Sequence, residues 1–283
     1  MRERVRAQLA SIEREHDCRV LYACESGSRA WGFASPDSDY DVRFVYTHPV
    51  AWHLRLEERR DSIEFMAPDA LDLSGWELGK ALRLFAGCSP ALNEWLGSPE
   101  VYRAEEEFVA AMRALVPAYF NPRKALHHYL SMAQKTADRE IRDGQVRIKK
   151  AFYVLRPLLA CRWILDRLEM PPTPFRDLLE QPLPEELRAA IGELLDRKSR
   201  AAEGELATLS AVLATWIGEA LEHTAARAAG VPASRGHDWE PLNALMLRWV
   251  GHESGIALAS HPGADSGEAG TGVAVLFGTR PTP

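Results

Sequence analysis

The segment Glu25–Phe44, ESGSRAWGFASPDSDYDVRF, constrains the fold more than any other part of this 283-residue chain. A Gly-Ser pair at Gly27 and Ser28 is followed, after ten intervening residues, by Asp-Tyr-Asp inside a predicted strand. Because Asp39 and Asp41 are two residues apart, their side chains leave the same face of that strand. Neighbouring carboxylates repel each other unless a cation lies between them. The pattern therefore predicts a divalent-metal site that faces a phosphate-binding turn.

Composition limits the classes of partner. The net charge of −6 argues against holding a long nucleic acid mainly by its phosphates, so any such contact needs a local basic cluster. No apolar run approaches the ~20 residues that span a bilayer, and the charged N-terminal segment does not resemble a secretory signal. The four cysteines show no CxxC spacing and are expected to be buried, reduced thiols. These features predict a cytoplasmic protein without membrane contact.

Hydrophobic patterning predicts an α+β fold in which a mixed N-terminal part precedes a helical part. The expected strands share apolar or alternating character: 19–24, 39–46, 60–66 and 70–73. Ser74 and Glu77 fit a capping box that would start a helix at Ser74. The expected helices have apolar residues at helical spacing: 1–16, 105–116, 122–143, 147–168, 185–199, 203–229 and 239–250. The Gly-rich polar tail, residues 259–283, is expected to be disordered.

The Gly-Ser pair and the Asp-x-Asp strand together resemble the nucleotidyltransferase superfamily of polymerase β. Longer segments extend this match: GSRAWGFASPDSDYDVRF, LDLSGWELGKALRLF, SPALNEWLGSP and KKAFYVLRPLLACRWI. They resemble the RNA repair pathway DNA polymerase β family from about residue 20 to about residue 250. The resemblance implies a polymerase-β-like catalytic domain over 1–104 and a helical domain over 105–258 that binds substrate or nucleotide.

Each residue of the motif suits this chemistry. Gly27 permits a tight turn whose backbone N–H groups can approach phosphate oxygens. Ser28 offers a hydroxyl at a helix N-terminus, where anions are favoured. Asp39 and Asp41 are hard oxygen ligands of the kind that Mg²⁺ prefers, with Mn²⁺ as an alternative. The resemblance implies that they hold metal ions that activate an attacking hydroxyl and neutralise the leaving pyrophosphate of an NTP.

Catalysis of this type usually needs a third carboxylate on a neighbouring strand. The candidates are Asp61, Glu64, Asp69 and Asp72. Asp72 is favoured because it lies between two leucines, which points it away from the face that they bury. The helix expected from Ser74 would anchor it at the end of the strand, and the resemblance implies an acid in this context. Glu64, between Ile63 and Phe65, is the main alternative.

A basic helix offers groups for the triphosphate. Lys149, Tyr153 and Arg156 lie at positions i, i+4 and i+7 and share a helix face. Lys149 or Lys150, together with Arg156, could bind the β- and γ-phosphates, while Tyr153 could stack on the base or bond the ribose. The alternative is a solvated basic face with Tyr153 in the core.

Two further arginines lie close to the motif. Arg29 follows the Gly-Ser pair and either contacts a phosphate or is an ordinary surface arginine. Arg43 shares the strand face of the aspartates and is expected to pair with Asp41 or Asp72 and keep it ionised.

The leading hypothesis is a Mg²⁺-dependent nucleotidyltransferase that moves a nucleoside monophosphate from an NTP, such as ATP, to a hydroxyl. The family resemblance suggests an RNA 3′ end as acceptor, in RNA repair. A second hypothesis keeps the fold and makes a protein the acceptor, as in toxin–antitoxin systems, which the acidic balance mildly favours. A third is a non-catalytic nucleotide-binding regulator.

Overall fold

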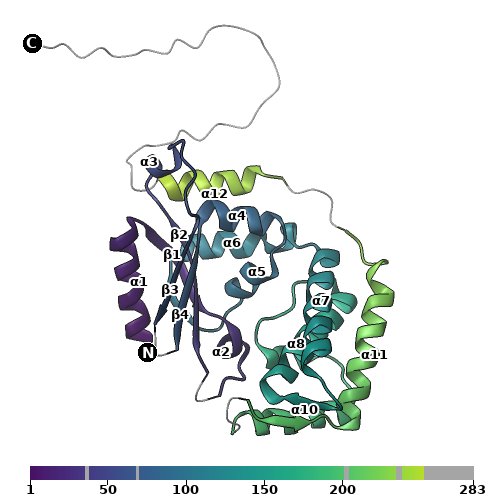
Figure 1. Ribbon diagram of the computed structural model, residues 1–283. Helices are drawn as coiled ribbons and strands as arrows, with labels where there is room; N and C mark the ends of the chain where they lie inside the picture. Colours follow the sequence, from purple (N-terminus) through teal and green to yellow (C-terminus); the bar gives the residue numbers. More distant parts are fainter. Residues whose placement is uncertain (36–37, 68–69, 201–203, 234–237, 252–283) are drawn as a thin grey trace, which may run out of the picture.

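The computed structural model describes residues 1–35, 38–67, 70–200, 204–233 and 238–251 (Figure 1). The tail predicted to be disordered, 259–283, lies outside these residues, as does Asp69.

A five-stranded mixed sheet forms the N-terminal part, with the strand order β3-β4-β2-β1-β5. Its strands are β1 Arg19–Glu25, β2 Tyr40–Thr47, β3 Ser62–Ala67, β4 Leu71–Glu77 and β5 Val101–Ala104. β2 and β4 are parallel, whereas the other neighbouring pairs are antiparallel. The four predicted strands are confirmed apart from their ends, and β5 was not predicted.

Both faces of the sheet are covered (Figure 1). Helix α1, Arg2–His16, packs Val5, Leu9 and Ile12 against one face, which confirms the predicted helical spacing. The opposite face is covered by α4 Leu78–Ala86, α5 Pro90–Leu96, α6 Glu106–Tyr119 and α12 Glu240–Gly251. Burial on both faces explains why β1 reads as a continuous apolar run.

The predicted capping box at Ser74 is wrong. β4 continues to Glu77 because Ser74 pairs with Arg43 of β2 on one side and with Glu64 of β3 on the other. Glu77 is itself the N-cap of α4: its carboxylate accepts hydrogen bonds from the backbone N–H groups of Gly79 at 2.7 Å and Lys80 at 3.4 Å. A residue with strand partners on both sides stays in the ladder, which overrides the local helix-start signal.

The rest of the chain is mainly helical, as predicted. Its helices include α7 Pro122–Glu140, α8 Ile148–Arg167, α9 Phe175–Leu178, α10 Glu185–Lys198 and α11 Ala211–Ala228. The predicted helix 203–229 is shorter, because residues Leu206–Thr208 form strand β7, which pairs with β6, Gln145–Arg147. Ser210 then caps α11 by accepting a hydrogen bond from the backbone N–H of Leu213 at 3.3 Å.

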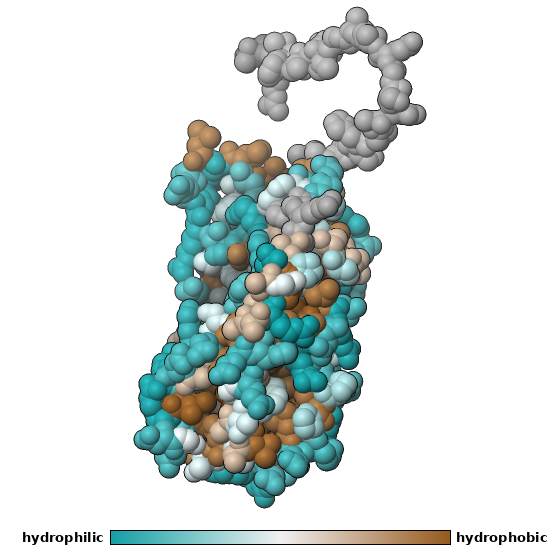
Figure 2. All heavy atoms as spheres, turned by 90° about the vertical axis from the view of Figure 1, so that its right-hand side faces the viewer, coloured by the Kyte–Doolittle hydropathy of each residue, from teal (hydrophilic) through white to brown (hydrophobic). Residues whose placement is uncertain are grey.

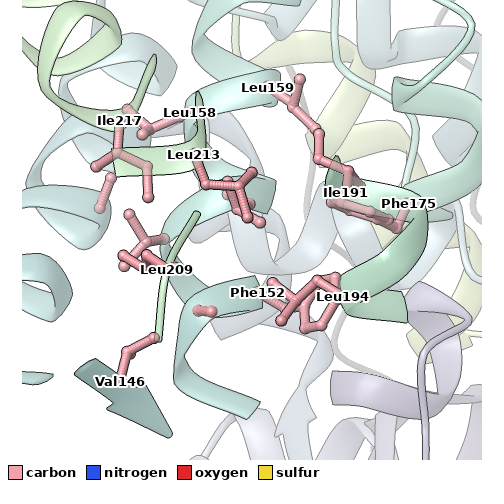
Figure 3. Packing of buried hydrophobic residues seen from close by; sticks show 14 of the residues in the cluster. Val146, Phe152, Leu158, Leu159, Phe175, Ile191, Leu194, Leu209, Leu213 and Ile217 are labelled. Atoms are coloured by element: carbon pink, nitrogen blue, oxygen red, sulfur yellow. The ribbon is translucent and has the colours of Figure 1, made fainter. Parts of the chain in front are cut away.

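A hydrophobic cluster around α8 holds the helical part together. Figure 3 shows Phe152, Leu158 and Leu159 of α8 packed among side chains from α9, α10 and α11. Trp31 and Phe33, which follow the Gly-Ser pair, belong to the same cluster. The segment that carries the motif is therefore anchored both to the sheet and to the helical part.

Two helices of the C-terminal part pack on the sheet layer. Leu242, Leu245 and Trp249 of α12 lie in one cluster with Leu78 of α4 and Phe108 of α6. The division at residue 104 stays a prediction, but the packing puts α6 and α12 beside the sheet. The face drawn in Figure 2 is mostly hydrophilic with scattered apolar residues. In the described part of the chain, no helix combines the length and apolar character needed to cross a membrane.

Candidate active site

The Gly-Ser pair opens a short helix, α2 Gly27–Trp31, directly after β1. The backbone N–H of Ser26 donates to the carbonyl of Asp41 at 2.8 Å, which ties the turn to β2. Gly27 has φ +57°, and a Cβ at this position would lie 2.2 Å from Oδ2 of Asp41. Glycine is thus needed for two reasons, the left-handed backbone and the close approach of a carboxylate. Ser28 is buried behind it.

Asp41 and Asp72 are direct register partners on the parallel strands β2 and β4. Their flanking residues Val42, Leu71 and Leu73 are buried against α1, so both carboxylates project from the other face of the sheet. Each aspartate side chain is 30% exposed. The third carboxylate predicted from leucine flanks is therefore placed beside the Asp-x-Asp motif.

Asp39 lies immediately before β2, because the strand begins at Tyr40 and not at Asp39 as predicted. It is exposed, two residues from Asp41. Burial is the main cause of a raised pKa of Asp41, and the negative charges of Asp72 and Asp39 raise that pKa further. The positive charge of Arg43 acts in the opposite direction. Asp41 thus interacts electrostatically with both other acids near the N-terminal ends of β2 and β4.

Arg43 lies between two of these acids. Its Nη2 is 3.2 Å from Oδ1 of Asp41 and 2.9 Å from Oδ2 of Asp72. The predicted pairing of Arg43 is confirmed, and the arginine bridges both partners.

Glu64, the alternative third acid, lies elsewhere. It is on β3, its side chain is 65% exposed, and it pairs with Arg60 at 3.0 Å. Asp61, another candidate, pairs with Lys80 at 2.9 Å. Among the described candidates, Asp72 is the acid in register with Asp41.

The donor chemistry of this site fits Mg²⁺, since it offers carboxylate oxygens beside a turn with backbone N–H groups. Within the residues described, however, no three His, Cys, Asp or Glu side chains are gathered closely enough to hold an ion. Asp41 and Asp72 converge on Arg43, and Asp39 stands outside that pair. The residues therefore suit Mg²⁺ in the chemistry of their ligand atoms. The guanidinium of Arg43, however, lies between the carboxylates of Asp41 and Asp72.

Arg29 contacts the loop that precedes β2. Its Nε donates to the carbonyl of Asp39 at 3.0 Å and its Nη2 to the carbonyl of Ser38 at 2.7 Å. The guanidinium also lies 3.7 Å from the centre of the Tyr40 ring. Arg29 therefore orders the segment that carries Asp39.

The basic helix α8 approaches the site with its first turn. The positive charge of Lys149 lowers the pKa of Asp41, although less than Arg43 does, so this lysine is near enough to interact electrostatically with that carboxylate. Lys150 lies 4.9 Å from the Tyr153 ring centre, and partial burial lowers the pKa of Lys150. Tyr153 packs edge-on against Trp31 with ring centres 5.2 Å apart.

Arg156 does not face the site. It is 1% exposed, and its Nη1 donates to Oε1 of Glu94 at 2.9 Å. Its Nε and Nη2 donate to the carbonyl of Thr173, and its guanidinium lies 4.5 Å from the Trp31 ring centre. The expected phosphate contact is not compatible with this burial, because helix α8 turns Arg156 into the core.

Two acids that the sequence analysis missed, Glu94 and Glu25, accept hydrogen bonds from residues around the site. Glu94 accepts hydrogen bonds from Arg156, Tyr129 and Trp31, and so links α5, α7, α8 and α2. Glu25, which is buried, accepts a hydrogen bond from the backbone N–H of Asp41 at 2.7 Å and another from the hydroxyl of Tyr102. Burial raises the pKa of Glu25. The available signal was a lone acid within an otherwise apolar run, RVLYACE or PALNEWL.

Comparison with known proteins agrees with this geometry. A family model described as "RNA repair pathway DNA polymerase beta family" matches residues 1–248, which include both the sheet and α8. The chain belongs to the RNA repair pathway DNA polymerase beta family. It is also 40% identical over 251 residues to "Uncharacterized protein YcgL" of Bacillus subtilis (strain 168), covering 88% of this chain and 96% of that protein. The mixed sheet followed by helices is consistent with a polymerase-β-like domain, and membership suggests a nucleotidyltransferase-like role.

Proposed function

We propose that this protein is a Mg²⁺-dependent nucleotidyltransferase that moves a nucleoside monophosphate from an NTP to the 3′ hydroxyl of an RNA. The observation that carries this proposal is the direct pairing of Asp41 with Asp72 beside the Gly27 turn. The family description supports RNA as the acceptor. Mn²⁺ is the alternative metal, and the four free thiols support a reducing, cytoplasmic setting.

The proposed reaction divides its tasks among the residues of the site. The acceptor oxygen attacks the α-phosphorus, the bond from that phosphorus to the β-phosphate oxygen breaks, and pyrophosphate leaves. Asp72 takes the proton of the acceptor hydroxyl, and the backbone at Gly27 and Ser28 cradles the triphosphate. A metal ion held by Asp39, Asp41 and Asp72 would lower the pKa of the attacking hydroxyl and neutralise the leaving group.

The remaining residues hold or orient these groups. Lys149, with Lys150 and Tyr153 on the same helix, supplies positive charge and an aromatic face for the nucleotide. Arg29 orders the segment before Asp41, and Arg156 supports α2 through its contact with Trp31.

Labelled-NTP transfer tests this assignment. Wild-type protein is incubated with α-labelled NTPs and RNA oligonucleotides ending in a 3′ hydroxyl or a 3′ phosphate. We expect labelling of the hydroxyl form only. Asp41→Asn and Asp72→Asn should each lower the rate at least about 100-fold, beyond the 10–100-fold typical of outer-shell partners of a metal. Circular dichroism checks that both variants fold.

Glu64→Gln is the matched control, because Glu64 is exposed on the adjacent strand and pairs only with Arg60 among the residues described. It should retain the wild-type rate. A normal rate in Asp72→Asn would contradict the assignment of Asp72. Labelling of lysate proteins with no labelling of RNA would favour the second function, protein nucleotidylation, which the net charge of −6 suits.

A further inference from the structure

The guanidinium of Arg43 lies where the two paired carboxylates meet. Its Nη2 contacts Oδ1 of Asp41 and Oδ2 of Asp72, and its Nη1 donates to the carbonyl of Val42 at 3.0 Å. The Arg43 side chain is mostly buried, as are those of both aspartates. This is a partly desolvated cation held by charge-assisted contacts to two acids.

A cation at this place relieves the repulsion between Asp41 and Asp72, which face each other on neighbouring strands. A divalent ion bound by the same two oxygens would relieve the same repulsion. A guanidinium and a metal ion cannot both hold that space at low cost, since like charges a few ångströms apart repel strongly in a partly buried site. The contacts of Arg43 Nη2 occupy one carboxylate oxygen of each aspartate, and these are oxygens that such an ion would need.

We infer that Arg43 is an internal competitor of the catalytic metal, so that the ion binds well only when an NTP is present to draw Arg43 from the carboxylates. This inference rests on the proposed function. The triphosphate brings oxygens that complete the coordination of the ion and negative charge that accepts the released guanidinium. Arg43 thereby makes metal and nucleotide binding cooperative and keeps the free protein from loading metal alone.

Arg43 could instead help the metal to bind, and this alternative predicts the opposite change in metal affinity when Arg43 is removed. If the arginine only held the carboxylates in a metal-ready arrangement, its removal would weaken metal binding. If it competes with the metal, its removal strengthens metal binding in the absence of nucleotide. The dissociation constant of the metal separates the two without any measurement of turnover.

The experiment measures Mn²⁺ binding by electron paramagnetic resonance, with and without a non-hydrolysable NTP analogue. Arg43→Gln should bind Mn²⁺ at least about 10-fold more tightly than wild type without the analogue, because a like charge next to the ion is removed. The tightening caused by the analogue should be smaller in Arg43→Gln than in wild type. Arg43→Lys keeps the positive charge but lacks the planar guanidinium that contacts both acids. Its Mn²⁺ affinity should lie between those of wild type and Arg43→Gln, and it replaces Arg43→Gln in the experiment if that variant does not fold.

Arg60→Gln is the matched control, since it removes the same charge from an exposed pair that Arg60, just before β3, forms with Glu64 of β3. Its Mn²⁺ affinity should equal that of wild type. If Arg43→Gln binds Mn²⁺ no more tightly than wild type without the analogue, while wild type binds Mn²⁺ with the analogue, the inference about Arg43 is wrong and the proposed function still stands. Absence of Mn²⁺ binding in wild type even with the analogue, or wild-type binding in Asp41→Asn, contradicts the proposed function and the inference with it.

Discussion

At the scale of single residues, the contact between the Gly27 backbone and the Asp41 carboxylate is the tightest restriction in the site. A Cβ at Gly27 would lie 2.2 Å from Oδ2 and 3.1 Å from Cγ of Asp41. Gly27→Ala therefore has to displace either the turn or the carboxylate. We expect a loss of about 1–3 kcal/mol in the free energy of unfolding from the strained backbone, and a loss of transfer activity from the displaced aspartate, measured by denaturant titration and labelled-NTP transfer.

Gly32→Ala separates strain from displacement. Gly32 has φ +84°, but nothing lies within 4 Å of the position that its Cβ would take. It should share the loss of stability and keep most of the activity. Equal activity losses in the two variants would show that the Asp41 contact is not what matters at Gly27.

The position of a single residue could be predicted where it depends on nearby sequence. The flanking leucines indicated the sheet face on which Asp72 lies, because alternation along a strand is a local property, whereas its role as the third acid stays a prediction. The roles of Arg156 and Glu94 could not be predicted, since these residues are 62 positions apart and meet only through helix packing. A helix-face argument places Lys149 and Arg156 together, but Arg156 points into the core, where it pairs with the partly buried Glu94 of another helix.

At the scale of helices and strands, Glu94 is the junction at which four helices share one carboxylate. Its partner Arg156 is almost fully buried. Among the described residues, Glu94 is the acid with which Arg156 forms an ion pair. Glu94→Gln leaves this guanidinium in the core without a counter-charge. We expect the free energy of unfolding to fall by about 3 kcal/mol or more, as for a broken buried pair, measured by chemical denaturation.

Glu64→Gln again supplies the control, because its exposed pair with Arg60 should contribute only about 0–1 kcal/mol. Since Trp31 of α2 donates to Glu94 at 3.3 Å, we also expect Trp31 fluorescence to shift in Glu94→Gln. Similar small losses in both variants would contradict a central role for Glu94.

At the scale of the whole molecule, the last described helix returns to the first half of the chain. Leu242 of α12 is 1% exposed in the cluster with α4 and α6, whereas Leu247 on the same helix is 54% exposed. Leu242→Ala should lower the free energy of unfolding by about 2–5 kcal/mol. Leu247→Ala should change it by no more than about 0.5 kcal/mol. Thermal and chemical unfolding of the full chain check both, and equal effects would refute the packing of α12 on the sheet layer.

The fold class and most elements were predicted because helical and strand periodicities are local. The end of β4 and the start of α11 were not, because strand pairing with distant residues decided both. Strand β5 escaped prediction for the same reason: its four residues gain their structure from pairing with β1. The packing of α12 over the sheet depends on contacts between residues more than 130 positions apart, such as the edge-on contact of Trp249 with Phe108, and has no short-range signal.

The direct pairing of Asp41 with Asp72 requires a fixed register between β2 and β4, so insertions within these strands are not tolerated, whereas insertions in the connecting loops are. One residue added within β4 ahead of Asp72 would turn its carboxylate toward α1 and leave Asp41 without its neighbour. The connection from β2 to β3, residues 48–61, lies outside this register, and lengthening a surface connection costs little. Members of the family should therefore differ in length between β2 and β3, while the acids at positions 41 and 72 keep their places in the register of β2 and β4.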